Sequence, residues 1–159
     1  EYIVDPNVHE CKRCPAACVC DGSVLTDPVD GAVWEPDNAT GVYMLKSCPA
    51  GHQKVNSIGG QFNAEVQQCR PCTNGLEYIV DPNVHECKRC PAACVCDGSV
   101  LTDPVDGAVW EPDNATGVYM LKSCPAGHQK VNSIGGQFNA EVQQCRPCTN
   151  GLEYIVDPN

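Results

Sequence analysis

The chain has 159 residues, including 14 cysteines, and its 20 acidic against 10 basic residues give a formal net charge of −10. Cysteine at this density is typical of secreted scaffolds in which disulfides replace a large hydrophobic core, so the composition predicts an extracellular or cell-surface protein. The acidic balance disfavours nucleic acid and anionic membrane surfaces as partners, and no run approaches the roughly 20 apolar residues of a membrane span.

A perfect internal repeat organises the sequence. Residues 1–76 recur without one change as residues 77–152, and residues 153–159 begin a third copy. Each full copy holds seven cysteines and a net charge of −4, and no Ser/Gly linker separates the copies. We therefore expect a tandem array in which each repeat contacts mainly its neighbours.

Turn-forming residues interrupt each copy so often that only short strands fit between them, and no long helix is predicted. Residues 32–45 are the first predicted hairpin, because β-branched and aromatic residues flank a turn rich in Pro, Asp and Asn near residues 36–41. This turn would place Trp34 close to Tyr43 across the hairpin.

A second hairpin is expected from residues 53–55, through a turn at residues 57–60, to Gln61 and Phe62. The core of one repeat is too small to be stable alone. The aromatic residues assigned to this core are Trp34, Tyr43 and Phe62. The predicted fold class is a small, disulfide-rich, mostly β array of short-hairpin modules with little helix.

The cysteine spacing fits two chemistries. The seven cysteines of one copy follow the pattern C-x2-C-x3-C-x-C-x27-C-x20-C-x2-C, and 14 residues separate the last from the first cysteine of the next copy. One hypothesis is a ladder of disulfides. The other is a zinc ribbon, in which four thiolates hold a tetrahedral zinc without any histidine. The thiolates would come from Cys69, Cys72, Cys87 and Cys90.

The disulfide hypothesis is favoured over the zinc ribbon. A zinc ribbon leaves Cys94, Cys96 and Cys124 without a role, in an acidic chain whose cysteine content indicates an oxidising compartment. We therefore expect neither zinc nor any other cofactor. The spacing alone does not fix which cysteines pair.

Three cysteine segments carry a family resemblance. Residues 48–51 (Cys-Pro-Ala-Gly), 69–72 (Cys-Arg-Pro-Cys) and 87–91 (Cys-Lys-Arg-Cys-Pro) resemble the CPxG…CxxC…CxxCP pattern of ephrin-receptor-like and growth-factor-like (EGF-like) cysteine-rich repeats. In that family a CPxG cysteine pairs with the next cysteine along the chain. The resemblance implies the pairs Cys48 with Cys69, Cys72 with Cys87, and Cys90 with Cys96. Over both copies, the cysteines proposed to form disulfides are Cys14, Cys20, Cys48, Cys69, Cys72, Cys87, Cys90, Cys96, Cys124 and Cys145.

Four cysteines have no partner within the sequence under this pairing. Cys11 requires a partner before residue 1, and Cys148 requires one after residue 159. Cys18 and its copy Cys94 are left over, at a position where the family often has another residue. A leftover cysteine in a secreted chain is a free thiol or an intermolecular crosslink. We expect a lateral disulfide between neighbouring chains, and the alternative is a buried, inert thiol.

Asn38 and Asn114 are predicted N-glycosylation sites. Both stand in the sequence Asn-Ala-Thr, within the predicted turn of the first hairpin of each copy, where a glycan can point into water. The alternative is an ordinary Asx turn. A glycan on every copy would give the array a hydrated coat.

No other residue pattern indicates a metal site or catalysis. The acidic cluster of each copy matches no EF-hand loop, and we interpret it as solvated turns. The cluster comprises Asp21, Asp27, Asp30, Glu35 and Asp37. His9 and His52 have no paired nucleophile or carboxylate pattern, so the chain is not expected to be an enzyme.

Three further segments of the repeat, taken together with its cysteines, carry a second resemblance. Residues 20–23, 31–37 and 43–49 are similar to repeats in large surface proteins of microalgae, among them mastigoneme-type flagellar hairs. The resemblance implies a non-enzymatic structural protein of an extracellular filament or appendage, with neighbouring repeats, other chains and glycans as its partners. The alternatives are the stalk of a receptor-like or adhesive ectodomain, and a zinc-ribbon array.

Overall fold

The computed structural model describes residues 1–156, so the last three residues of the predicted third-copy segment 153–159 lie outside the described part. The chain divides into two compact units. Unit 1 comprises Glu1–Pro71 with Pro82–Glu86, and unit 2 comprises Cys72–Asp81 with the chain from Cys87 onward. Each unit therefore contains residues from both full copies of the sequence repeat.

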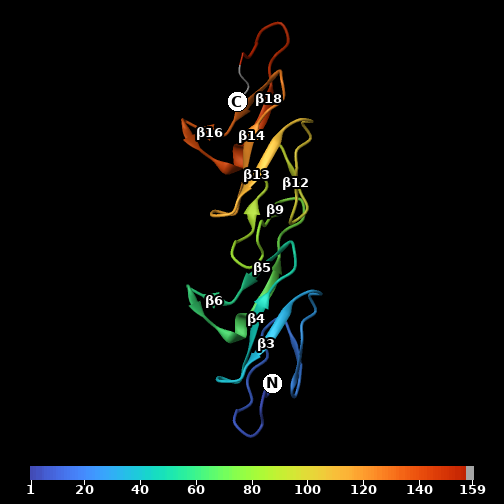
Figure 1. The fold of residues 1–159 in the computed structure, drawn as a ribbon, viewed down its shortest axis with the longest axis vertical. Helices are drawn as coiled ribbons and strands as arrows, with labels where there is room; N and C mark the ends of the chain where they lie inside the picture. Colours follow the sequence, from blue (N-terminus) through green and yellow to red (C-terminus); the bar gives the residue numbers. More distant parts are fainter. Residues whose placement is uncertain (157–159) are drawn as a thin grey trace. The chain divides into compact units, whose positions relative to one another are not determined.

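Unit 1 is a set of short antiparallel strand pairs, which Figure 1 shows in the blue to green part of the ribbon. Strand β1 pairs with β2, β3 with β4, β5 with β8, and β6 with β7. Its elements are β1 (Val19–Asp21), β2 (Val24–Thr26), β3 (Val33–Asp37), β4 (Val42–Ser47), β5 (His52–Val55), β6 (Ser57–Ile58), β7 (Gln61–Phe62), the 3-10 helix η1 (Ala64–Val66) and β8 (Gln68–Pro71).

Unit 2 repeats this arrangement and begins with one further pair, β9 with β10. The remaining pairs are β11 with β12, β13 with β14, β15 with β18, and β16 with β17. Its elements are β9 (Glu77–Tyr78), β10 (Lys88–Arg89), β11 (Val95–Cys96), β12 (Leu101–Thr102), β13 (Val109–Asp113), β14 (Val118–Ser123), β15 (His128–Val131), β16 (Ser133–Ile134), β17 (Gln137–Phe138), the 3-10 helix η2 (Ala140–Val142) and β18 (Gln144–Pro147). Both units have the predicted fold class, which is small, disulfide-rich and mostly β.

The first predicted hairpin is confirmed. Strands β3 and β4 pair so that Trp34 faces Leu45 and Tyr43 faces Pro36, which places Tyr43 one diagonal position from Trp34, where the sequence predicted the two residues close together. The turn is shorter than predicted because β3 continues through Pro36. An edge strand tolerates proline where the missing N–H would not have joined the ladder, and β3 has a partner on one side only.

The second predicted hairpin is wrong in its outer part. Strands β6 and β7 form a tight hairpin around Gly59 and Gly60, whose φ values of 57° and 81° suit a two-residue turn. Continuing this register would pair residues 53–55 with residues 64–66, but those residues form η1, whose first turn is capped by the side chain of Asn63. Residues 53–55 lie in β5 and pair with β8 instead.

The core of each unit is small and lies around a disulfide. In unit 1 the buried residues Leu45, Cys48 and Cys69 form one cluster, and the half-buried Trp34 packs against it. Unit 2 repeats the cluster with Leu121, Cys124 and Cys145. Assigning Phe62 to the core was wrong, because the residue is 52% exposed.

Candidate functional site: the repeat junction and its cysteines

The structure contains five disulfides within residues 1–156, and they join the same cysteines that the family resemblance implied. They are Cys14–Cys20, Cys48–Cys69, Cys72–Cys87, Cys90–Cys96 and Cys124–Cys145. The four cysteines of the zinc-ribbon hypothesis lie in three different disulfides, so no thiolate remains on them to bind a metal.

The Cys72–Cys87 disulfide covalently joins the first copy to the second, and both of its cysteines belong to unit 2. A turn beside it spans the copy boundary. The Glu77 carboxylate accepts a hydrogen bond from the Thr73 amide at 2.8 Å, and the Glu77 amide donates to the Thr73 carbonyl at 2.8 Å. The amide of Cys90 also donates to the Leu76 carbonyl at 2.8 Å, and that of Gly75 to the Cys96 carbonyl at 2.8 Å. The boundary between copies is therefore an ordered part of one unit.

Tyr78 anchors this junction. Its side chain is 1% exposed, it pairs with Lys88, and it forms a parallel bridge with Gly98. Its hydroxyl oxygen accepts a hydrogen bond from the Tyr119 amide at 3.0 Å, and the two rings meet edge to face with centroids 5.1 Å apart. Burial raises the pKa of the Tyr78 hydroxyl above its usual value. No sequence pattern had singled out this tyrosine.

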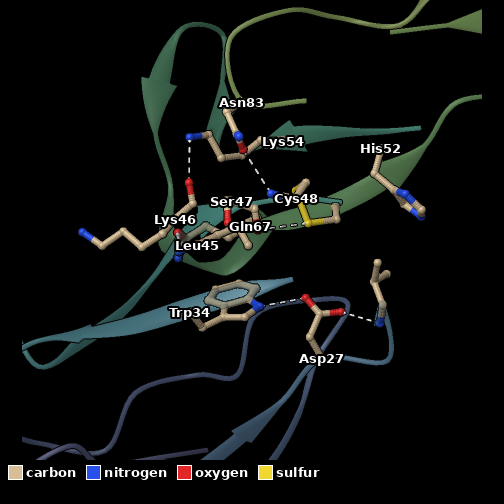
Figure 2. The surroundings of a disulfide bond; sticks show 12 residues. Asp27, Trp34, Leu45, Lys46, Ser47, Cys48, His52, Lys54, Gln67 and Asn83 are labelled. Carbon is tan, nitrogen blue, oxygen red and sulfur yellow. Dashed lines mark hydrogen bonds between the residues drawn. A yellow bond between two sulfur atoms is a disulfide. The ribbon is translucent and has the colours of Figure 1, made fainter. Parts of the chain in front are cut away.

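Unit 1 also uses residues of the second copy. The Pro82 carbonyl accepts a hydrogen bond from the Lys54 amide at 3.0 Å. The side chain of Asn83 accepts from the Cys48 amide at 3.1 Å, next to the Cys48–Cys69 disulfide (Figure 2). The copy boundary in the sequence is thus not a boundary of the folded unit.

A buried glutamine supports the core of each unit. Gln67 is fully buried, and its side-chain oxygen accepts from the Leu45 amide at 2.9 Å while its side-chain nitrogen donates to the Tyr43 carbonyl at 2.8 Å. Those two backbone groups point from the same edge of β4, away from β3, so the glutamine amide occupies the position of a neighbouring strand. Gln143 does the same in unit 2. Nothing in the sequence distinguished Gln67 from Gln68.

Asp27 is a structural acceptor and not a solvated turn residue, which corrects the interpretation of the acidic cluster at this position. Its two carboxylate oxygens accept from the Trp34 indole N–H at 2.8 Å, as Figure 2 shows, and from the Val29 amide at 2.8 Å. Within residues 1–156, no group of three or more His, Cys, Asp or Glu side chains is arranged to hold a metal ion.

The leftover cysteine lies next to this aspartate. Cys18 is half-buried and free, and burial together with the Asp27 carboxylate raises the pKa of its thiol to about 12. Burial and Asp103 do the same for Cys94. The thiolate is the reactive form of cysteine. The environment therefore favours the inert-thiol hypothesis over the lateral crosslink.

Two further cysteines are free in the described chain, and both are equivalent to members of the junction disulfide. Cys11 is exposed and corresponds to Cys87. Cys148 is half-buried and corresponds to Cys72. These are the two cysteines whose partners the resemblance placed outside the sequence.

Both predicted glycosylation sites are exposed at the tip of a hairpin. Asn38 lies between β3 and β4, and Asn114 lies between β13 and β14. Asp37, not Asn38, organises the first tip, because its carboxylate accepts from the Thr40 hydroxyl at 2.8 Å and the Ala39 amide at 2.9 Å. These hydrogen bonds lower the pKa of the Asp37 carboxyl.

The histidines have structural contacts. His9 Nε2 lies 3.0 Å from the carbonyl oxygen of Asn38, and the ring packs directly on Gly41. His52 Nδ1 lies 3.1 Å from the carbonyl oxygen of Ala50. Neither histidine is placed beside a nucleophile by these contacts.

No protein-family profile, curated protein or solved structure matches the chain. The five disulfides and the short antiparallel strands define the class of protein, a disulfide-bonded, β-rich cysteine-rich repeat. Disulfides in this number are typical of proteins that mature in an oxidising compartment. In the part of the chain that is described, no helix has the length and apolar character needed to cross a bilayer.

Proposed function

We propose that the protein is a structural component of an extracellular filament or cell-surface appendage, built from tandem EGF-like cysteine-rich repeats as in mastigoneme-type hairs. It has no catalytic role and requires no cofactor. It is secreted, it carries N-linked glycans on Asn38 and Asn114, and its main partners are copies of its own repeat.

The observation that carries this proposal is the sharing of residues between copies. Unit 1 contains residues 82–86 of the second copy, unit 2 contains residues 72–76 of the first, and the Cys72–Cys87 disulfide crosslinks the copies. Units that each contain residues of the neighbouring copy suit a continuous array, in which stability depends on neighbouring repeats.

The disulfides also suit a filament that is stretched by external force. They close loops with sequence separations of 6, 21, 15, 6 and 21 residues. A fully extended chain spans about 3.5 Å per residue. When the Cα–Cα distance across each disulfide is subtracted from the length of its loop, the five loops together shorten the fully stretched chain by about 210 Å. The covalent loops would therefore limit how far a filament extends after its strands separate.

Single-molecule stretching of the 159-residue chain tests this role. The contour length should rise by about 210 Å when the disulfides are reduced. The double variant Cys72→Ser, Cys87→Ser should gain about 47 Å without reductant, because it frees only the junction loop of 15 residues. Equal contour lengths before and after reduction would contradict the proposal. Antibodies against the repeat should also decorate extracellular filaments on intact cells.

A stalk in an adhesive ectodomain is the second candidate, and one surface feature favours it. The β6–β7 hairpin exposes 59% of Ile58 and 52% of Phe62, and residues 55–64 contain no charge. Ile134 and Phe138 repeat this feature in unit 2. Binding of a foreign ligand through these hairpins would support the stalk, and electron micrographs that show repeat-only filaments would support the structural role.

A further inference from the structure

The β6–β7 hairpin stands out from the body of unit 1, as its repeat β16–β17 does from the body of unit 2 (Figure 1). All of residues 57–62 are exposed, and so are residues 133–138. Among the described residues, β6 and β7 pair only with each other, so the outer edge of each strand is open. The hairpin therefore offers unpaired strand edges to other molecules.

The strand register shows which groups point outward. The Asn63 amide donates to the Asn56 carbonyl at 3.0 Å, so these two residues form a hydrogen-bonded pair. The next pair, Ser57 with Phe62, is then of the non-hydrogen-bonded kind. The backbone N–H and C=O of Phe62 therefore point away from β6, at the outer edge of β7. Because side chains alternate between faces along a strand, Ile58 and Phe62 place one apolar side chain on each face of the hairpin.

This hairpin lacks the residues that usually prevent pairing between strand edges. Soluble proteins protect open edges with charged side chains and proline. In this chain the β3–β4 pair contains Glu35, Pro36 and Lys46, and the β5–β8 pair contains Lys54 and Arg70. Residues 55–64 contain neither a charge nor a proline. The β6–β7 edges are thus left open to pairing, in a chain that protects its longer strands.

We propose that these hairpins are the lateral contact between neighbouring chains: the outer edge of β7 pairs antiparallel with the outer edge of β7 in a second copy, and the two Phe62 rings lie side by side. The outward N–H and C=O of Phe62 gain partners in this arrangement. The contact uses the same surface on both molecules, so it is two-fold symmetric. This inference rests on the proposed filament function and deepens it, because it names the surface through which arrays associate.

The small area of the hairpin indicates which partner covers it. With Phe62 52% and Ile58 59% exposed, one hairpin offers about 200 Å² of apolar surface. Contact between two hairpins buries about 400 Å², whereas specific interfaces bury about 1,200–2,000 Å². A stable complex therefore needs about three or more such contacts, from a partner that repeats its site. A second copy of the array is such a partner, since the hairpin recurs unchanged every 76 residues.

The charge of the chain also favours a second copy over a basic partner at this surface. Each copy carries a net charge of −4, so two chains repel one another over most of their surface. Repulsion is weakest where both surfaces are free of charge, and a charge-free hairpin has no carboxylate to hold a basic partner. Added salt should therefore strengthen the association by screening the remaining repulsion.

The test compares arrays of two, four and eight consecutive copies by sedimentation velocity. The 159-residue chain, which has two of these hairpins, should remain single at micromolar concentration. The association constant should rise at least about tenfold with each doubling of the number of copies. An association constant that does not depend on the number of copies, or that falls with added salt, would overturn the inference.

Two matched pairs of substitutions, introduced into every copy, locate the contact. Phe62→Thr with Phe138→Thr should abolish association, because it removes the ring without a change of charge. Both rings are half exposed and threonine favours strands, so the fold should be retained. The control is Val19→Thr with Val95→Thr, which removes apolar surface from residues that are 70% and 64% exposed on other strands. Equal association constants for the two pairs of variants would refute the assignment.

Amide hydrogen exchange tests the edge pairing itself. The Phe62 amide points outward and should become protected in associated arrays, whereas the Ile58 amide already faces Gln61 within the hairpin and should not change. Associated arrays with an unprotected Phe62 amide would overturn the inference, and so would capture of a foreign ligand by hairpins of arrays that stay single. If arrays stay single while antibodies still decorate extracellular filaments, this inference fails and the proposed function stands. Arrays that associate as described, with no filaments decorated on cells, would give the reverse result.

Discussion

Replacing Gln67 by alanine should destabilise unit 1 by about 3 kcal/mol. The side chain makes three hydrogen bonds, to the Leu45 amide, the Tyr43 carbonyl and the Ala64 carbonyl, and each contributes about 1 kcal/mol net. The loss also leaves the Leu45 amide without its acceptor in a buried environment. A change of this size is a large fraction of the stability of a small domain.

Urea unfolding and amide hydrogen exchange measure this effect, and the chain provides two controls. Gln143→Ala should reproduce the loss in unit 2, because Gln143 makes the equivalent hydrogen bonds. Gln68→Ala should cost less than about 1 kcal/mol, because its half-buried side chain makes no hydrogen bond within residues 1–156. Equal losses for Gln67→Ala and Gln68→Ala, with the Leu45 amide still protected from exchange, would refute this argument.

Three further predictions concern single residues. First, Cys11 should be alkylated at pH 8 in the folded chain while Cys18 is not. A pKa of about 12 leaves about one Cys18 thiol in ten thousand ionised at that pH. Equal alkylation rates for the two cysteines, measured by mass spectrometry, would contradict this. Second, Gly41→Ala should cost about 2 kcal/mol in urea unfolding, because φ is +69° and a Cβ would lie 2.6 Å from the His9 ring. Gly59→Ala, with φ +57° and no atom within 4 Å, should cost about half as much, and the opposite order would refute the packing argument. Third, hydrogen bonds from Thr149 and Arg146 lower the pKa of the Glu153 carboxyl from 4.5 to about 2. The Thr149–Glu153 turn should therefore persist above pH 4.5 and open as the pH falls towards 2, where this carboxylate becomes protonated. Glu153→Gln should remove this pH dependence of Thr149 amide exchange, and an unchanged profile would contradict the assignment.

The fold class and the first hairpin followed from the sequence because they depend on local patterns. Short strands between turn-forming residues and a high cysteine content indicate a disulfide-rich β protein. The errors arose where two local patterns competed. The Gly59-Gly60 turn fixed a hairpin so short that residues 53–55 were left to pair with β8, and Phe62 remained exposed.

The candidate site was predictable only in its cysteines. Pairing within each copy and across the boundary followed from a family resemblance, whereas the roles of Gln67 and Asp27 depend on tertiary contacts. Gln67 reaches backbone groups 22 and 24 residues away in the chain, and its sequence context is an ordinary Gln-Gln pair. Asp27 resembled every other turn aspartate until its contact with Trp34 was seen.

Disulfide mapping of native material, alkylated before any reduction and with and without a chelator, tests the central claim most directly. The account predicts a peptide pair joined by Cys72 and Cys87, which is the bond between copies. It also predicts no change with chelator, and a loss of glycan mass at Asn38 on enzymatic deglycosylation. If Cys69, Cys72, Cys87 and Cys90 become alkylated only when the chelator is present, the disulfide array is wrong and the repeats hold zinc.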